Sequence, residues 1–156
     1  MRARGYTLIE LLVVLAVLGL LASMVMPLAE MTVQREKEHE LKRALWEIRD
    51  AIDAYHQARV GGLLPGVGDI STYPATLEVL TEAQPDGRPG HEGQVLRFLR
   101  RIPRDPFADP GVDSDKTWGL RSYASDADHP KSGDDVYDVF SLSNRTGLNG
   151  VPLAQW

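Results

Sequence analysis

The sequence predicts an α+β fold in which one long N-terminal helix packs on a small antiparallel sheet. A helical pattern runs without interruption from Tyr6 to about Val60, and two segments with strand-like alternation, residues 118–124 and 136–142, follow much later. The 156 residues suit one modest domain plus an appendage, and their net charge of −5 argues against nucleic acid as a partner. Without cysteine the chain has no disulfide and no Cys/His zinc site.

The first half of the helical region is uniformly apolar. No residue from Leu11 to Ala29 is charged, and residues 6–29 are long enough as a helix to cross a hydrocarbon layer of about 30 Å. The run is too long and too uniformly apolar for a core helix packed at the surface of a globular domain. A cleaved secretory signal needs a small-residue site that Ala22-Ser23-Met24 supplies poorly. We expect a retained membrane helix, with the basic leader, residues 1–5, in the cytoplasm and the C-terminal part across the membrane.

Two residues stand out in this apolar helix. Glu10 places a carboxylate where an ionisable group costs several kcal/mol. The side chain either reaches the membrane interface or pairs with a cation inside an assembly. Pro27 removes a helical hydrogen bond and Gly19 lowers local helix stability, so the helix is expected to curve or partly melt when subunits pack.

Residues 30–60 continue the helix with one apolar face. Its members recur at steps of three and four, and they are Leu41, Leu45, Ile48, Ile52 and Tyr55, widened by Ala44, Ala51 and Ala58. The opposite face carries charges of both signs, either solvated or paired between subunits. Gly61-Gly62 is expected to end the helix.

The remainder, residues 61–156, is predicted to be a small globular domain. We expect a loop at 61–73, a short helix at 75–82 with Leu77 and Leu80 inward, a polar loop at 84–93, and a helical turn or two at 95–101. In the second strand, Val136, Phe140 and Leu142 share one face, and Tyr137, Val139 and Ser141 share the other. The tail, residues 144–156, is expected to fold back on the sheet.

The N-terminal motif resembles a known processing signal. Gly5-Tyr6-Thr7-Leu8-Ile9-Glu10, followed by the apolar run, resembles the class III signal of type IV pilins and type II secretion pseudopilins. The resemblance implies a type IV pilin-like fold, cleavage between Gly5 and Tyr6 by prepilin peptidase, and N-methylation of Tyr6, where the family usually has Phe. It further implies that Glu10 neutralises the N-terminal amine of a neighbouring subunit, and Pro27 also matches a family position.

A second segment favours the type II secretion pseudopilins over the type IV pilins. Ile102-Pro103-Arg104-Asp105-Pro106-Phe107 resembles the Leu-Pro-x-Asp-Pro-Trp segment of the major pseudopilin of type II secretion. This implies a structural subunit, not an enzyme, that forms a periplasmic filament with copies of itself and with other pseudopilins on an inner-membrane assembly platform. The four histidines show no triad or metal-ligand spacing. The alternative is a type IV pilin or minor pilin for adhesion, twitching or DNA uptake.

A cluster of aspartates makes calcium a candidate cofactor. The predicted hairpin loop and the strand after it contain Asp126, Asp128, Asp134, Asp135 and Asp138. Oxygen-rich loops suit Ca²⁺, although a solvated acidic turn would have the same composition. In the resembling pseudopilins calcium binds in the loop after the last strand, here Ser141 to Gly150, and this chain has no acidic residue there.

Overall fold

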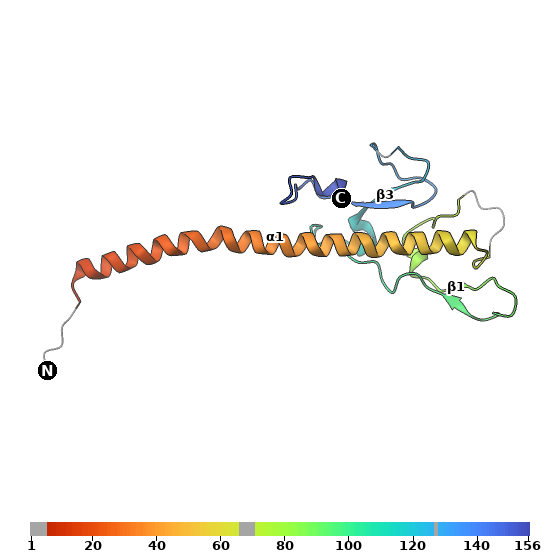
Figure 1. Ribbon diagram of the computed structural model, residues 1–156, viewed down its shortest axis with the longest axis horizontal. Coiled ribbons are helices and arrows are strands. Elements are labelled where there is room, and N and C mark those ends of the chain that lie inside the picture. The colour runs from red at the N-terminus through yellow and green to blue at the C-terminus, as the bar shows by residue number, and fades with distance from the viewer. Residues whose placement is uncertain (1–5, 66–70, 127) are drawn as a thin grey trace. The chain divides into compact units, whose positions relative to one another are not determined.

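The computed structural model describes residues 6–65, 71–126 and 128–156, and for residues 23–29 it describes the backbone alone. The chain divides into two compact units, one ending at Glu36 and the other spanning Lys37–Trp156. Helix α1, Leu8–Val60, contributes residues to both units (Figure 1). The predicted long N-terminal helix is therefore confirmed, with its first residue two positions later than expected.

The end of α1 is fixed by a glycine turn. The N–H of Leu63 donates to the carbonyl of Ala58 at 2.8 Å, and the N–H of Gly62 donates to that of Arg59 at 3.2 Å. Gly62 has a φ of +71°, a left-handed conformation that favours glycine. These are the two bonds of a Schellman motif, so the predicted stop at Gly61-Gly62 is confirmed.

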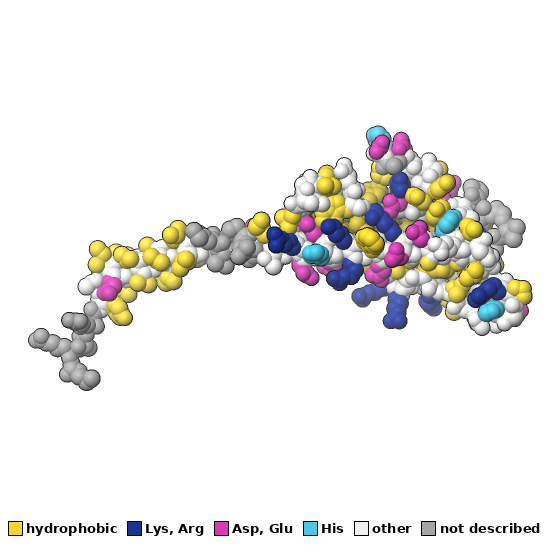
Figure 2. Space-filling model, viewed as in Figure 1, with side chains coloured by type: hydrophobic (Ala, Val, Ile, Leu, Met, Phe, Trp, Pro, Cys, Tyr) yellow, Lys and Arg dark blue, Asp and Glu magenta, His cyan; other side chains and the backbone are white. Residues whose placement is uncertain are grey.

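The first unit contains the apolar start of α1. Its described side chains between Leu8 and Leu21 are exposed, and Figure 2 shows hydrophobic atoms over most of their surface. Within the residues whose side chains are described, no helical stretch is both long and apolar enough to cross a membrane. The expected membrane helix, residues 6–29, includes side chains at 23–29 that lie outside this description.

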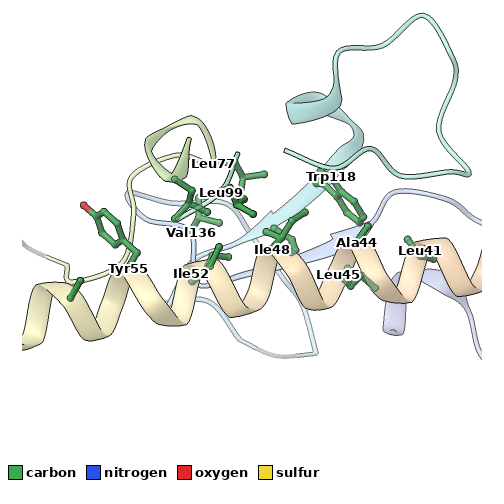
Figure 3. Close-up of a cluster of buried hydrophobic side chains, with 14 of the residues drawn as sticks. Leu41, Ala44, Leu45, Ile48, Ile52, Tyr55, Leu77, Leu99, Trp118 and Val136 are labelled. Carbon is green, nitrogen blue, oxygen red and sulfur yellow. The ribbon is translucent and has the colours of Figure 1, made fainter. Parts of the chain in front are cut away.

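The second unit has its core along one face of α1. Leu41, Leu45, Ile48 and Ile52 are each at most 1% exposed, which confirms the apolar face read from the sequence. Figure 3 shows α1 side chains of this face beside Leu77, Leu99, Trp118 and Val136, which come from the later segments. Full burial of one such aliphatic side chain contributes about 1.5–3 kcal/mol, so this face holds the later segments on the helix.

The two predicted strands form an antiparallel pair. Strand β3, Trp118–Arg121, pairs with β4, Asp138–Ser141, with Trp118 opposite Ser141 and Gly119 opposite Phe140. Both strands are shorter than predicted. On one predicted face Val139 and Ser141 are fully buried and Tyr137 is half-buried. On the other face Val136 is buried, whereas Leu142 is exposed.

One prediction for the globular part is wrong. Residues 95–101 do not form helical turns, because strand β2, Val95–Leu96, pairs with β1, Gln84–Pro85, in a second two-stranded sheet. The N–H groups of Phe98 and Leu99 both donate to the carbonyl of Leu80, at 3.1 and 2.8 Å. These long-range partners replace the local helical bonds that the residue pattern favoured.

The remaining helical segments are single short turns. The helix expected at 75–82 is reduced to the 3-10 turn η1, Glu78–Leu80, although Leu77 and Leu80 are buried as predicted. A second turn, η2, spans Ser114–Thr117. The tail contains η3, Leu153–Gln155, which contacts β4 and whose Leu153 is fully buried. The predicted return of the tail to the sheet is therefore confirmed.

Candidate processing and assembly site

Thr7 and Glu10 form a reciprocal cap at the start of α1. The Thr7 N–H donates to Oε2 of Glu10 at 3.4 Å, and the Glu10 N–H donates to Oγ1 of Thr7 at 3.3 Å. This is a capping box, in which side chains accept from two backbone donors at the helix start, and the Glu10 N–H also donates to the Thr7 carbonyl at 3.1 Å. The Thr-x-x-Glu spacing before an apolar run is the sequence signature of this box, and it adds Thr7 to the residues that the sequence predicts for the site.

The other residues of the predicted processing site are only partly described. Gly5 lies outside the described residues, whereas Tyr6 is 79% exposed immediately before the capping box. Helix α1 continues through Pro27, whose side chain lies outside the description. The cap therefore places a carboxylate within the first helical turn, close in sequence to the predicted new N-terminus. A negative charge there also interacts favourably with the helix dipole.

Asp135, one of the candidate calcium ligands, is buried in a network of hydrogen bonds. Its Oδ1 accepts from the Ser122 hydroxyl at 2.6 Å and from the Tyr123 N–H at 2.9 Å, and its Oδ2 accepts from the Ser71 hydroxyl at 2.5 Å. Burial alone would raise the pKa of this carboxyl, but these hydrogen bonds outweigh burial and lower it. The carboxylate joins the start of the loop after β3 to Ser71.

Asp138 on β4 is held by two guanidinium groups. Its Oδ1 accepts from Nε of Arg49 at 2.8 Å, and its Oδ2 accepts from Nη2 of Arg121 at 3.3 Å. Both oxygens thus face cations from α1 and β3. The carboxylate is neutralised within the fold, so a metal ion at this position would have to displace an arginine.

The five candidate ligands do not converge on one point. Asp126 and Asp134 are exposed, and Asp126 accepts from the N–H of Asp128 at 3.2 Å, which makes a local turn. Among residues 6–65, 71–126 and 128–156, no three acidic or histidine side chains lie close enough together to share a metal ion. The structure brings Asp135 to Ser71 and Asp138 to Arg49, and leaves the remaining three at the surface.

The segment that resembles the major pseudopilin packs on the sheet through Asp105. This carboxylate is 1% exposed, accepts from the Phe107 N–H at 2.7 Å and accepts from the Ser141 hydroxyl at 2.5 Å. The indole N–H of Trp118 donates to the carbonyl of Pro103 at 2.8 Å. The proline-rich segment is thereby fixed to both β3 and β4, which gives its residues a structural role.

Two of the four histidines have structural partners. The ring of His56 stacks on Tyr73 with centroids 4.3 Å apart, and its Nδ1 lies 2.8 Å from Oγ1 of Thr72. Nδ1 of His91 lies 3.1 Å from Oε1 of Gln94. These contacts tie α1 to the loop after it and close the turn between β1 and β2.

Comparison with known proteins identifies relatives. A family model described as the prokaryotic N-terminal methylation motif matches residues 1–26. The type II secretion system core protein G of Klebsiella pneumoniae is 32% identical over 112 residues, covering 68% of this chain and 70% of the relative. The protein of the same name from Pseudomonas aeruginosa is 31% identical over 110 residues, covering 68% and 69%.

A longer alignment covers nearly the whole chain. The type II secretion system core protein G of Dickeya chrysanthemi is 27% identical over 157 residues, covering 96% of this chain and 95% of the relative. No solved structure matches the chain. The similarity therefore extends from the methylation motif through the unit Lys37–Trp156.

Proposed function

Because the chain belongs to the family of the type II secretion system core protein G, we propose that its N-terminal helix is processed, inserted and then packed into a periplasmic filament. The chain is a pseudopilin subunit, anchored in a membrane and assembled with other components of a secretion system. Its proposed task is structural, with no catalytic step of its own.

Processing would begin at the leader. Prepilin peptidase would cut between Gly5 and Tyr6, remove residues 1–5 and leave the new N-terminus of Tyr6 for methylation. Support comes from the match of the methylation motif to residues 1–26 and from the exposure of Tyr6 before the capped helix. An exposed, non-helical Tyr6 is compatible with entry into a peptidase site.

The mature subunit would be a single-pass protein of the bacterial inner membrane. Residues 6–29 would form the membrane and later filament-core helix, residues 30–60 its amphipathic continuation, and residues 61–156 the periplasmic domain. Partners would be further copies of the chain, other pseudopilins and the inner-membrane assembly platform. The basic leader before the apolar run supports this orientation.

Glu10 would set the register between subunits. The observation that carries this proposal is the capping box, which holds the Glu10 carboxylate in the first helical turn through Thr7. After cleavage, an α-amino group of a neighbouring subunit could meet this carboxylate in the apolar filament core, where each charge is costly alone and tolerable when paired. Pro27 would let the helix bend as subunits pack.

Replacing Gly5 tests the processing step. Gly5→Ala should leave the full-length band unshifted on a denaturing gel when the chain is coexpressed with prepilin peptidase. The matched control is Gly19→Ala, within the apolar start of α1, where an added Cβ meets no atom within 4 Å. Normal processing of Gly5→Ala would remove the proposed cleavage site.

Glu10→Gln tests the assembly step. Glutamine also serves in a capping box, so this variant keeps the helix start and removes only the charge. We expect Glu10→Gln to be cleaved and inserted normally but to form few filaments, as measured by shearing and immunoblotting. Wild-type filament yield from Glu10→Gln would refute charge pairing at this residue.

A further inference from the structure

The loop that follows β4, Ser141–Gly150, is held by protein contacts of its own. Three of its side-chain oxygens accept from backbone donors. Oγ of Ser141 accepts from the Ser143 N–H at 3.1 Å, and Oγ of Ser143 accepts from the Arg145 N–H at 3.3 Å. Oδ1 of Asn149 accepts from the Val151 N–H at 3.0 Å. Three oxygens that could have been neutral metal ligands are therefore occupied in stabilising turns.

The backbone closes the same loop. The Gly147 N–H donates to the carbonyl of Val151 at 2.9 Å, and the Leu153 N–H donates to that of Arg145 at 2.9 Å. Thr146 and Pro152 form an antiparallel bridge. The loop is thus a small hairpin that returns the chain to the sheet at the buried Leu153.

The charges around the loop disfavour a divalent cation. Ca²⁺ takes six to eight oxygen ligands, usually with several carboxylates, and residues 141–150 contain neither Asp nor Glu. The guanidinium of Arg145 lies over the ring of Phe107 at 5.4 Å, and Nζ of Lys37 lies over the same ring at 5.8 Å. Two cations at one aromatic ring would repel a third, so the donor set does not fit the calcium that the family resemblance implies for this loop.

One carboxylate does reach the loop, and it comes from α1. Glu38 is buried, with 9% of its surface exposed, and its Oε1 accepts from the Leu148 N–H at 2.8 Å. The two residues are 110 positions apart in the sequence. A charged acceptor strengthens such a bond, and burial protects it from water.

We infer that Glu38 anchors the Ser141–Gly150 loop to α1 and takes the structural place of the calcium ion expected in this family. The two ends of the segment 141–156 are fixed by other contacts. The Ser141 hydroxyl donates to the buried Asp105, and Nη2 of Arg49 donates to the carbonyl of Trp156 at 2.8 Å. Between these ends, Glu38 supplies an attachment at Leu148, near the midpoint of residues 141–156.

The inference has a direct test with metal. The full chain, purified in detergent, should have the same melting temperature in excess chelator, in millimolar CaCl₂ and in millimolar MgCl₂. An ion that binds the folded state and not the unfolded one raises the melting temperature. A rise of several degrees with CaCl₂ that MgCl₂ does not reproduce would overturn the inference.

A second test addresses Glu38 itself. Glu38→Ala leaves the Leu148 N–H without its acceptor, and hydrogen exchange at residues 146–150 should accelerate by about tenfold, the equivalent of one lost hydrogen bond. Glu38→Gln keeps an oxygen acceptor and should restore part of the protection. The matched control is Glu40→Ala, which removes an exposed carboxylate from the same helix.

The outcomes separate this inference from the filament proposal. Unchanged exchange in Glu38→Ala would overturn the anchor even if the variant assembles normally. Failure of the Gly5 or Glu10 predictions would leave the exchange and melting results as they are, because those measurements concern only the folding of the unit Lys37–Trp156. If Glu38→Ala fails to fold, Glu38→Gln and the calcium titration of the unaltered chain still decide the matter.

Discussion

Arg49 on α1 and Asp138 on β4 are joined by a hydrogen-bonded ion pair, with Nε of Arg49 donating to Oδ1 of Asp138 at 2.8 Å. The Nη2 group of the same arginine donates to the carbonyls of Val139 and Trp156, at 3.1 and 2.8 Å. One side chain thus connects the helix, the strand and the C-terminal tail. A planar guanidinium with several fixed donors suits this arrangement in a way that lysine would not.

Replacing Arg49 should loosen the tail and the sheet together. We expect Arg49→Leu to lower the free energy of unfolding by about 2–3 kcal/mol, because three acceptors lose a charged donor in a half-buried setting. Denaturant unfolding of the full chain in detergent measures this. Arg43→Leu removes an exposed arginine of the same helix and should change the stability little; equal losses in both variants would contradict the structural role of Arg49.

The capping box predicts a local effect at the start of α1. Thr7→Val should destabilise the helix start by about 0.5–2 kcal/mol, because the N–H of Glu10 loses the Oγ1 acceptor. Faster amide exchange at residues 8–11 of the chain in detergent would report it. Thr7→Ser retains the hydroxyl and should exchange like the unaltered chain, and no difference between the Val and Ser variants would argue against the cap.

A side chain added at Gly119 would clash at the centre of the strand pair. A Cβ at this position would lie 2.3 Å from ring atoms of Phe140, the residue opposite it in β4. Gly119→Ala should therefore cost about 1–3 kcal/mol of stability, measured by thermal unfolding. Combining it with Phe140→Leu should recover part of the loss. Gly111→Ala, where a Cβ meets no atom within 4 Å, provides the control.

The stability of the β1–β2 turn is expected to depend on pH through the carboxyl of Asp86. Hydrogen bonds from Arg88, the shortest at 2.5 Å from Nη2 to Oδ2, lower the pKa of the Asp86 carboxyl to about 2. A depressed pKa means that the folded chain holds the charged form more strongly than the unfolded chain does. The stability from this bond is complete above the ordinary aspartate pKa, near 3.9, and is lost as the pH falls toward about 2.

The measurement is the unfolding free energy of the full chain against pH. The unfolding free energy of the unaltered chain should decline between about pH 4 and pH 2, and Asp86→Asn should lack the share of this decline that comes from the Asp86 carboxyl. Asp113→Asn is a useful comparison, because Asp113 pairs with Lys116 on an exposed turn. An identical decline in Asp86→Asn and in the unaltered chain would show that the Arg88 bond adds no acid-sensitive stability.

The elements read correctly from the sequence are those with strong local patterns. The three- and four-residue spacing of Leu41, Leu45, Ile48 and Ile52 identified the buried face of α1, and the alternation around β3 and β4 identified both strands. The prediction of helical turns at 95–101 is wrong, since these residues pair with β1 and bond to Leu80, which lie beyond the reach of helical i to i+4 bonds. No local pattern carries that information.

The sequence by itself determined the methylation motif, the apolar helix with Glu10 inside it, the amphipathic continuation and the glycine stop, because each depends on residues within a few turns of one another. Only the tertiary structure decided what the carboxylates do. Asp135 lies against serine hydroxyls, Asp138 lies between two arginines, and Glu38 reaches the Leu148 N–H. Whether an acidic side chain binds a cation, a hydroxyl or a backbone donor depends on which distant groups folding brings within hydrogen-bond distance.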